Sequence, residues 1–408
     1  MQKESFLNGL LALAFFLLPW QTRWMFGFHL LDGQTYEYGI LSIYMVEMLV
    51  MGCFFLALLF KRFIIPDRFA LPVILCLIAF GVSTFFSIDP VLSLGQCVHV
   101  FSAICLFFLL LQPWAKAPIL LGSFLGGLII PILLGFFQIL TGSSPASSWL
   151  GLAFREAAHL GDSVLFAPDG TRILRAYGSF PHPNIFGGYL AVALFLFWKF
   201  GQDFFQSRWM RGIVFCFLGI GLVLTFSQSA WLSLVAGAIV LAGELFRNHK
   251  WSLMIFGIGI FLFITGTIFF LVTETQSSSQ RIDQYHDWPT VIQDSWLVGS
   301  GMGSYPLALH VSFPSQDVWS YQPIHNVFFL VISDIGIFGF CCLILGLFLL
   351  KSKDFLREPI VFVFLPLLLF DHYLWSFWSG FALLALASGF VVKERQGKEV
   401  LDKENPMF

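Results

Sequence analysis

The stretch that decides the fold is residues 323–350, which read PIHNVFFLVISDIGIFGFCCLILGLFLL. After the opening Pro323-Ile-His325-Asn326, the run holds a single charged residue, Asp334. It is longer than the roughly 20 residues that an α-helix needs to cross a bilayer. The sequence therefore predicts a membrane-spanning helix that begins just after a histidine and an asparagine, and these two side chains are expected to face water at a membrane surface.

Working outward, similar apolar runs recur along the whole chain, at 6–20, 38–60, 69–87, 92–112, 118–140, 184–200, 211–226, 229–246, 252–272, 359–370 and 376–392. Of the 408 residues, 58% are hydrophobic and 11% are charged, whereas soluble globular proteins carry about 25% charged residues. No small-residue cleavage site follows the first run, so we interpret it as a retained helix and not as a signal peptide. We predict an all-α, polytopic transmembrane bundle of about twelve helices, with residues 1–392 forming one transmembrane domain.

The basic residues predict the orientation of this bundle. If the N-terminus is cytoplasmic, 17 of the 22 Lys and Arg residues fall in cytoplasmic segments and five fall outside. Because cytoplasmic loops are enriched in Lys and Arg, both termini are predicted to be cytoplasmic, and residues 393–408 are expected to form a disordered cytoplasmic tail. The formal net charge of −2 argues against a nucleic-acid partner.

Two external segments, 141–183 and 273–322, are too long to be simple connectors, and every predicted cytoplasmic loop is far shorter. Functional residues concentrate on loops that a rigid scaffold holds, so the chemistry is expected outside the cell. A shorter external segment, 21–38, is expected to lie along the lipid headgroups. The external basic residues are all arginines, either by chance or because fixed guanidinium forks bind phosphate or carboxylate there: Arg23, Arg155, Arg172, Arg175 and Arg281.

Two kinds of side chain inside the apolar runs need an explanation. Glu47 lies well within the second run, where an ionised carboxylate costs at least about 2.5–3.5 kcal/mol. It therefore has either a buried partner or function, or it is protonated and hydrogen-bonded between helices. The seven cysteines all fall in apolar runs without a Cys-x-x-Cys motif or an external pair, so we interpret them as core-filling residues.

One motif is similar to a known family. His325-Asn326, followed after nine residues by Gly336-x-x-Gly339, resembles the signature of the O-antigen ligase family of bacterial membrane glycosyltransferases. Asp334, two residues before the first glycine, matches the common form, whereas Phe340 stands where that family usually has Thr or Val.

Other blocks extend the resemblance over about residues 175–340. They are Arg175-x-x-Gly178-x-Phe180-x-x-Pro183-Asn184, the corner around Ser227, and Arg281 followed by Gly299-x-Gly301. At the corner this chain has Ser227-Gln228 where family members often have Ser-Arg, so the anion contacts fall to other arginines.

The resemblance implies a glycosyltransferase-C-like fold and a multi-pass location in the bacterial cytoplasmic (inner) membrane, with external helices over a cavity. It also implies metal-independent, inverting transfer of a glycan from a polyprenyl diphosphate carrier to an acceptor hydroxyl, without a cofactor. The partners would be that lipid-linked donor, membrane lipid, and a glycan, lipid or protein acceptor. Ligase, polymerase and protein glycosyltransferase all remain open, and the alternative of another class is a transporter or flippase of lipid-linked saccharides.

The resemblance also assigns roles. His325 would take the proton of the acceptor hydroxyl, and Arg175 and Arg281 would bind the diphosphate and stabilise its charge as it leaves. A second set is expected to contact substrate: Arg172, Asn326, Gln228, His182 and His372.

Structural readings compete with these roles. His325 and Asn326 are also typical helix-start residues, the arginines also suit lipid headgroups, and Asn184 is expected to be the N-cap of the next helix. Asp334 follows His325 by nine residues, about half a turn out of phase on a helix, so we expect it to pack and not to pair with the histidine. The glycines of 299–303 lack the lysine of a phosphate-binding P-loop. Asp283, His286 and Asp287 are a weaker alternative, as metal ligands.

Overall fold

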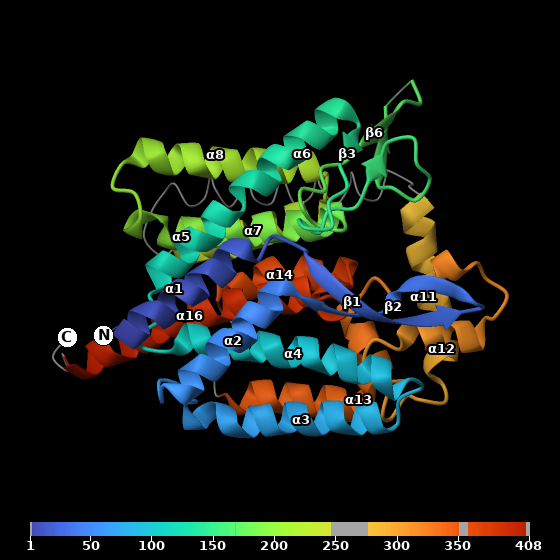
Figure 1. Cartoon of the computed structure of the whole chain (residues 1–408), viewed down its shortest axis with the longest axis horizontal. Helices are drawn as coiled ribbons and strands as arrows, with labels where there is room; N and C mark the ends of the chain where they lie inside the picture. The colour runs from blue at the N-terminus through green and yellow to red at the C-terminus, as the bar shows by residue number, and fades with distance from the viewer. Residues whose placement is uncertain (1, 168, 246–275, 351–357, 405–408) are drawn as a thin grey trace.

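The computed structural model describes residues 2–167, 169–245, 276–350 and 358–404, so the predicted run 252–272 lies outside the described residues. Most of the chain is helical, and the long helices run roughly side by side (Figure 1). They are α1 (Gln2–Leu17), α2 (Met45–Leu59), α3 (Ala70–Phe85), α4 (Pro90–Leu111), α5 (Ala117–Gly127), α6 (Ile129–Thr141), α7 (Pro183–Phe200), α8 (Arg208–Thr225), α9 (Gln228–Leu245), α13 (Val327–Leu349), α14 (Pro359–Phe370) and α16 (Trp378–Glu404).

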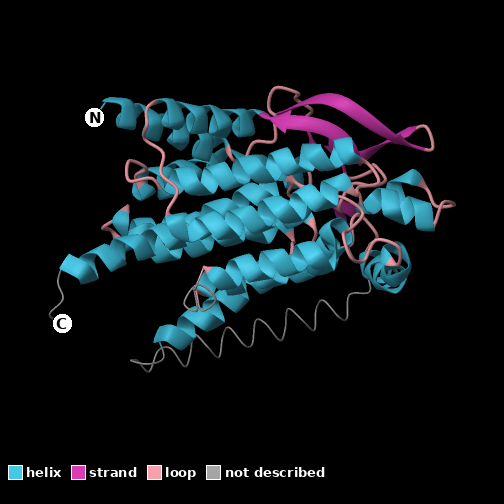
Figure 2. Ribbon diagram, turned by 90° about the horizontal axis from the view of Figure 1, so that it is seen from below, coloured by secondary structure: helices cyan, strands magenta, loops and turns pink. Residues whose placement is uncertain are grey.

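Shorter elements connect these helices. They are the helices α11 (Gln276–Ile292), α12 (Tyr305–Ser312) and α15 (Tyr373–Ser376), the 3₁₀ turns Asp67–Phe69, Gly201–Asp203 and Val318–Ser320, and the strands β1 (Arg23–Leu31), β2 (Gln34–Tyr44), β3 (Ser143–Ser144), β4 (Arg155–Glu156), β5 (Val164–Phe166) and β6 (Arg172–Leu174). The long hairpin β1–β2 lies beside one end of the bundle (Figure 2). The beginning of α1 and the C-terminal part of α16 lie at the other end of the bundle, which agrees with two termini on one side (Figures 1 and 2).

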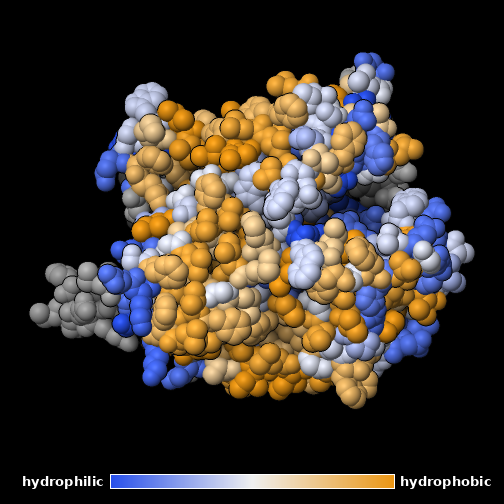
Figure 3. All heavy atoms as spheres, in the orientation of Figure 1, coloured by the Kyte–Doolittle hydropathy of each residue, from blue (hydrophilic) through white to orange (hydrophobic). Residues whose placement is uncertain are grey.

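Several helices suit a bilayer. Six helical stretches of the described chain are long and apolar enough to cross one: Asp67–Phe85, Pro90–Leu111, Ala117–Thr141, Pro183–Phe200, Arg208–Thr225 and Val327–Leu349. Three shorter apolar helices accompany them: Met45–Leu59, Gln228–Leu241 and Pro359–Phe370. Figure 3 shows hydrophobic residues over the sides of the helices and hydrophilic residues gathered at the end that carries α11, α12 and the strands. The chain is therefore a helical, multi-pass membrane protein, whereas the predicted number of about twelve crossings is not established.

The all-α prediction is wrong for residues 23–44, which form the antiparallel hairpin β1–β2. Asp32 and Gly33 make its two-residue turn, and both have positive φ, at 48° and 75°. Backbones of this kind match the right-handed twist of two paired strands, which is why Asp-Gly is a strong hairpin signal. The apolar run 38–60 consequently begins in a strand, and its helix starts only at Met45.

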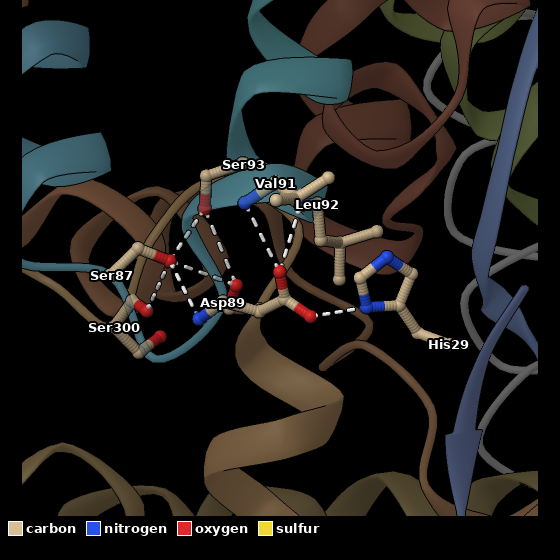
Figure 4. A network of polar contacts seen from close by, with 8 residues as sticks. His29, Ser87, Asp89, Val91, Leu92, Ser93 and Ser300 are labelled. Atoms are coloured by element: carbon tan, nitrogen blue, oxygen red, sulfur yellow. Dashed lines mark hydrogen bonds and ion pairs between the residues drawn. The ribbon is translucent and has the colours of Figure 1, made fainter. Parts of the chain in front are cut away.

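The hairpin is fastened to the bundle by a polar network (Figure 4). His29 on β1 pairs with one oxygen of Asp89, while the other oxygen accepts the N–H groups of the first turn of α4 at 3.0 and 3.1 Å. Ser87 hydrogen-bonds Ser93 at 2.7 Å and also lies within 3.3 Å of the Ser300 carbonyl. Residues 21–38 are thus part of a packed wall, and not merely a segment along the headgroups as predicted.

The two long external segments fold differently. Residues 141–183 contain the two-stranded sheets β3–β4 and β5–β6, in place of the external helices that we expected. The described part of 273–322 does contain helices, α11 and α12, as predicted.

The glycine run 299–303 serves close packing. Helix α13 breaks at Gly336, where φ is 68°, so the Ser333 and Asp334 carbonyls and the next N–H groups leave the helical pattern. Backbone groups of residues 296–301 replace the lost bonds, for example Ser300 N–H to Ser333 O at 2.8 Å and Ile337 N–H to Trp296 O at 2.9 Å. A Cβ on Gly336 would lie 2.2 Å from the Leu297 carbonyl oxygen, so only glycine allows this approach.

Buried charge has partners in both halves of the molecule. Glu47 is fully buried and accepts from Ser102 Oγ at 2.7 Å, and His99 Nδ1 lies 2.9 Å from its carboxylate. Glu47 thus has buried partners, which is one of the two interpretations that the sequence left open. At the opposite end, Glu358 bonds Lys199 at 3.0 Å and Arg395 at 2.7 Å.

The polar tail is helical as far as Glu404, because α16 continues past Val392. Lys393 Nζ donates to the carbonyls of Leu110 and Gln112 at 2.9 and 2.8 Å, which holds this helix against the end of α4. The prediction of disorder after Val392 is therefore wrong for these residues.

Candidate active site

His325 lies just before α13, and Gln284 on α11 fixes its ring. The Gln284 side-chain oxygen accepts the backbone N–H of His325 at 3.1 Å and lies 3.0 Å from its Nδ1. An amide oxygen only accepts hydrogen bonds, so Nδ1 must carry the proton of the neutral ring. The Nε2 lone pair of His325 is then unprotonated, which is the state that a general base needs.

The pKa of His325 favours the same state. Burial lowers this pKa well below its usual value of 6.5, and the nearby His372, Arg281 and His182 lower it further. The imidazole is consequently neutral at pH 7 in the absence of substrate.

One face of α11 supplies the groups that surround His325. Arg281, Gln284, Tyr285 and Trp288 follow the i, i+3, i+4, i+7 spacing that places side chains on one side of a helix. Trp288 donates to Ser333 Oγ on α13 at 2.8 Å, so this face is pressed against the helix that His325 precedes.

Arg281 extends from that face into the same site. Its positive charge lowers the pKa values of His325, His372, His182 and Arg175, which puts all four groups within its electrostatic reach. Its Nε atom is buried and has no hydrogen-bond partner in the described part of the chain. A buried N–H without a partner is a donor ready for an anionic ligand.

Arg175 reaches the site from the loop before α7. Its guanidinium donates to the Thr225 carbonyl, to Ser163 Oγ and to Asn184 Oδ1, each at 2.8 Å. Burial first, and Arg281 in addition, lower its pKa to about 10, so it stays charged at neutral pH. Asn184 Nδ2 in turn donates to Asp371 at 2.9 Å, which ties the guanidinium to the segment that carries His372.

His372 packs against His325, the candidate general base. The rings of His325 and His372 are 5.0 Å apart in an edge-to-face arrangement. Ser376 donates to the His372 carbonyl and so accepts from Nδ1 of that ring at 2.6 Å, which leaves Nε2 facing the Tyr38 hydroxyl at 3.5 Å. Burial lowers the pKa of His372 to about 4, with Arg281 acting in the same direction and Asp371 opposing it.

His182 is the N-cap of α7, so the prediction that Asn184 caps this helix is wrong. Its Nδ1 accepts the Asn184 N–H at 3.1 Å. Pro183 takes the first helical position, where its missing N–H costs nothing, and the cap therefore falls one residue earlier. Burial and then Arg175 keep the pKa of His182 well below its usual value.

The remaining predicted residues are placed less directly. Asn326 caps α13 through Phe328 N–H and Phe329 N–H at 3.0 and 3.3 Å, in line with an orienting role. Arg172 is not brought to this group, since its guanidinium donates to the Ala157 and His159 carbonyls of its own loop. Gln228 begins α9 beside the Thr225 corner, and its side chain makes no hydrogen bond with the described residues.

A metal site is not formed by the residues that the structure describes, because they contain no group of three or more His, Cys, Asp or Glu side chains with suitable geometry. The metal independence of the reaction stays a prediction.

The structure brings His325, Arg281, Arg175, His182 and His372 together from four separate segments. Residues 213–344 match the family model described as O-antigen ligase. The chain carries an O-antigen ligase domain. Searches of curated proteins and of solved structures found no match.

The O-antigen ligase domain spans most of α8, then α9, α11, α12 and most of α13, and it includes Arg281 and His325. The family is one of membrane glycosyltransferases that act in polysaccharide biosynthesis, so a glycosyltransferase-like enzyme is the activity that this domain indicates. Arg175, His182 and His372 lie outside the matched residues and are joined to them only by the fold.

Sequence reasoning missed two residues of the candidate site, Gln284 and Tyr38. Gln284 could have been found from its spacing to Arg281 on a helix, although the sequence reasoning placed no helix at particular residues of 273–322. Tyr38 comes from the unrecognised hairpin. Their roles depend on contacts between segments that lie far apart in the sequence.

Proposed function

We propose that this protein transfers a glycan from a polyprenyl diphosphate carrier to an acceptor hydroxyl at the outer face of the bacterial cytoplasmic membrane. The observation that carries the proposal is the contact of the Gln284 oxygen with His325 Nδ1, which favours the Nδ1–H tautomer, beside a buried Nε of Arg281 that has no partner among the described residues. A base with a free lone pair and an unused cationic donor is what this reaction needs.

The chemistry follows from these groups. The acceptor oxygen forms a bond to the anomeric carbon, and His325 Nε2 takes the hydroxyl proton. The bond from that carbon to the diphosphate oxygen breaks, and the electron pair leaves with the diphosphate. Arg281 and Arg175 stabilise the additional charge on the leaving group, as fixed guanidinium donors do. Attack opposite the diphosphate inverts the anomeric centre, and the reaction needs no metal ion.

The sequence-derived orientation supports an external site, because the beginning of α1 and the end of α16 lie at the end of the bundle opposite this site (Figures 1 and 2). Both termini would then be cytoplasmic, and the polyprenyl chain would remain in the bilayer beside the helices. Gln228, His182 and Asn326 are assigned to substrate contact or to the shape of the site, whereas Arg172 is not, because it bonds carbonyls of its own loop.

The test is glycan transfer by the purified protein in lipid nanodiscs, with a polyprenyl diphosphate-linked glycan and a lipid A–core acceptor. His325→Ala should lower turnover by about 10²–10⁴-fold, the usual contribution of a general base. His310→Ala is the matched control, because His310 is on the same external segment but pairs with Asp32 at 3.0 Å. Undiminished transfer by His325→Ala refutes the assigned base.

Two further measurements complete the test. Arg281→Lys should reduce turnover, because an ammonium group does not reproduce the fork of donors. Transfer that persists in a chelator supports metal independence, and loss of transfer in the chelator contradicts it. A single added block in the product identifies a ligase, whereas a ladder of lengths identifies a polymerase.

A further inference from the structure

A second polar space lies beside the candidate active site. It is a cavity of about 120 Å³ between the hairpin, α4, α12 and α13, and its wall includes Arg23, Glu37, Gln96, Tyr305, Asp334 and Phe377. At about 30 Å³ for each water molecule, this volume holds about four waters, which is the scale of a small polar group such as part of one sugar ring. Figure 3 shows a neighbouring hollow with a hydrophilic floor, between the part of the molecule that carries β3 and β6 and the part that carries the hairpin.

Two residues of the wall have unused hydrogen-bonding atoms. The Tyr305 hydroxyl and the Oδ1 atom of Asp334 are buried, and neither has a partner among the residues that the structure describes. The other carboxylate oxygen of Asp334 is held at 3.0 Å by both Gly303 N–H and Trp375 Nε1. Buried polar atoms without partners are rare, because they have given up hydrogen bonds to water without replacing them. A ligand that carries hydroxyl groups would supply hydrogen bonds to both the Tyr305 hydroxyl and Asp334 Oδ1.

The charges of the wall select the kind of ligand. Glu37 and Asp334 offset Arg23, so the cavity has no excess of positive charge that would favour a diphosphate. Phenol, carboxylate, amide and guanidinium groups are instead mixed with the rings of Tyr38 and Phe377, which lie 5.7 Å apart. Hydrogen-bond donors and acceptors beside aromatic rings suit a neutral polyol.

The cavity ends at the residues that surround the candidate base. Tyr38 and Ser376 line it and are the two side-chain partners of the His372 ring, and Pro323 on its wall is two residues from His325. Arg175 and Arg281 do not line it. The two guanidinium groups and the cavity thus approach the imidazole through different elements, as two substrates would.

We propose that this cavity binds part of one sugar ring of the acceptor and holds the acceptor hydroxyl toward His325. The proposal rests on the function given above, with the cavity taking the acceptor and the two arginines taking the donor. Entry of the ring shifts the Tyr305 and Asp334 side chains slightly, and their unused atoms then bond its hydroxyl groups.

The decisive variant is Tyr305→Phe, because it removes a hydroxyl that supports nothing in the described protein. The acceptor KM for lipid A–core should rise about fivefold, which is the value of one hydrogen bond, while the donor KM and the thermal stability stay unchanged. Tyr36→Phe is the matched control, since Tyr36 also has a buried and unpartnered hydroxyl but does not line the cavity. Equal acceptor KM values in both variants overturn the proposal.

A direct binding measurement separates this proposal from the proposed function. Fluorescently labelled lipid A–core oligosaccharide is titrated onto the wild-type protein and both tyrosine variants in nanodiscs without donor. Weaker binding only in Tyr305→Phe supports the cavity even if no transfer is detected. Transfer by the wild type together with equal binding by all three proteins overturns the cavity and leaves the transferase function standing. Asp334→Asn gives a second test: the affinity for the oligosaccharide should fall by about tenfold or more, because the hydrogen bond that is lost is charge-assisted.

Discussion

Gln284 offers the sharpest test of how the base is prepared. Its side-chain oxygen holds both the backbone N–H and the Nδ1 of His325, at 3.1 and 3.0 Å. Gln284→Leu keeps a similar volume and removes both bonds. At about 1 kcal/mol for each bond, the productive ring position and tautomer lose about 2 kcal/mol, which corresponds to about a 30-fold fall in kcat.

The matching variant Gln284→Glu changes the charge and preserves the acceptor. A carboxylate beside His325 favours the protonated imidazole, so the pKa of His325 should rise. The wild type, whose His325 pKa lies well below 6.5, should keep its activity as the pH falls below that value. In Gln284→Glu the acidic limb of the kcat/KM profile should move to higher pH.

The assay is glycan transfer in nanodiscs between pH 5 and 9, with the KM values of donor and acceptor measured separately. Gln293→Leu and Gln293→Glu are the controls, because Gln293 is exposed and follows the end of α11. Wild-type kcat in Gln284→Leu, or an unmoved pH profile in Gln284→Glu, would refute the argument that Gln284 sets the tautomer.

Three further predictions concern the frame of the site. Gly336→Ala should lower the unfolding free energy by about 2 kcal/mol or more in a denaturation assay, because its φ is 68° and the added Cβ would lie 2.2 Å from a backbone oxygen. Gly346→Ala is the control and should cost nothing, because its added Cβ would lie 3.5 Å from the nearest atom. Asn184→Leu breaks the bridge between Arg175 and Asp371, so the donor KM should rise about tenfold; an unchanged donor KM would contradict that bridge. The pKa of His372 is lowered from 6.5 to about 4, so in that window the folded protein binds fewer protons at this ring than the unfolded one. The ring's contribution to the unfolding free energy should fall by about 3 kcal/mol as the pH drops from 6.5 to 4, so His372→Gln should reduce the acid-side loss of stability by about that amount; an equal loss in wild type and variant would contradict this.

The helical membrane character could be predicted from apolar runs alone, because run length and composition decide whether a segment can cross a bilayer. The hairpin 23–44 was missed for the same reason, since its aromatic and β-branched residues look like part of an apolar run. The Asp32-Gly33 pair and the alternation around it carried the correct signal, which a search for long runs does not detect.

The candidate site could be predicted only in its charged members. Arg281, Arg175 and His325 were expected to meet because they stood out as external and chemically suited to an anionic donor. Gln284 was not identified, because its importance comes from a contact 41 residues away in the sequence. Arg172 shows the opposite limit, since a suitable residue type in a suitable segment bonds carbonyls of its own loop.

The break in α13 at Gly336 has one more consequence. The half-helix that follows His325 is joined by backbone bonds to residues 296–301, the loop that follows α11 and its Arg281. The separation between imidazole and guanidinium is therefore set by a short stretch of backbone that covalent and hydrogen bonds hold together. A thinner or thicker bilayer can tilt the surrounding helices and leave this spacing unaltered, so the enzyme should tolerate changes in lipid chain length that would disturb a site built from independent spans.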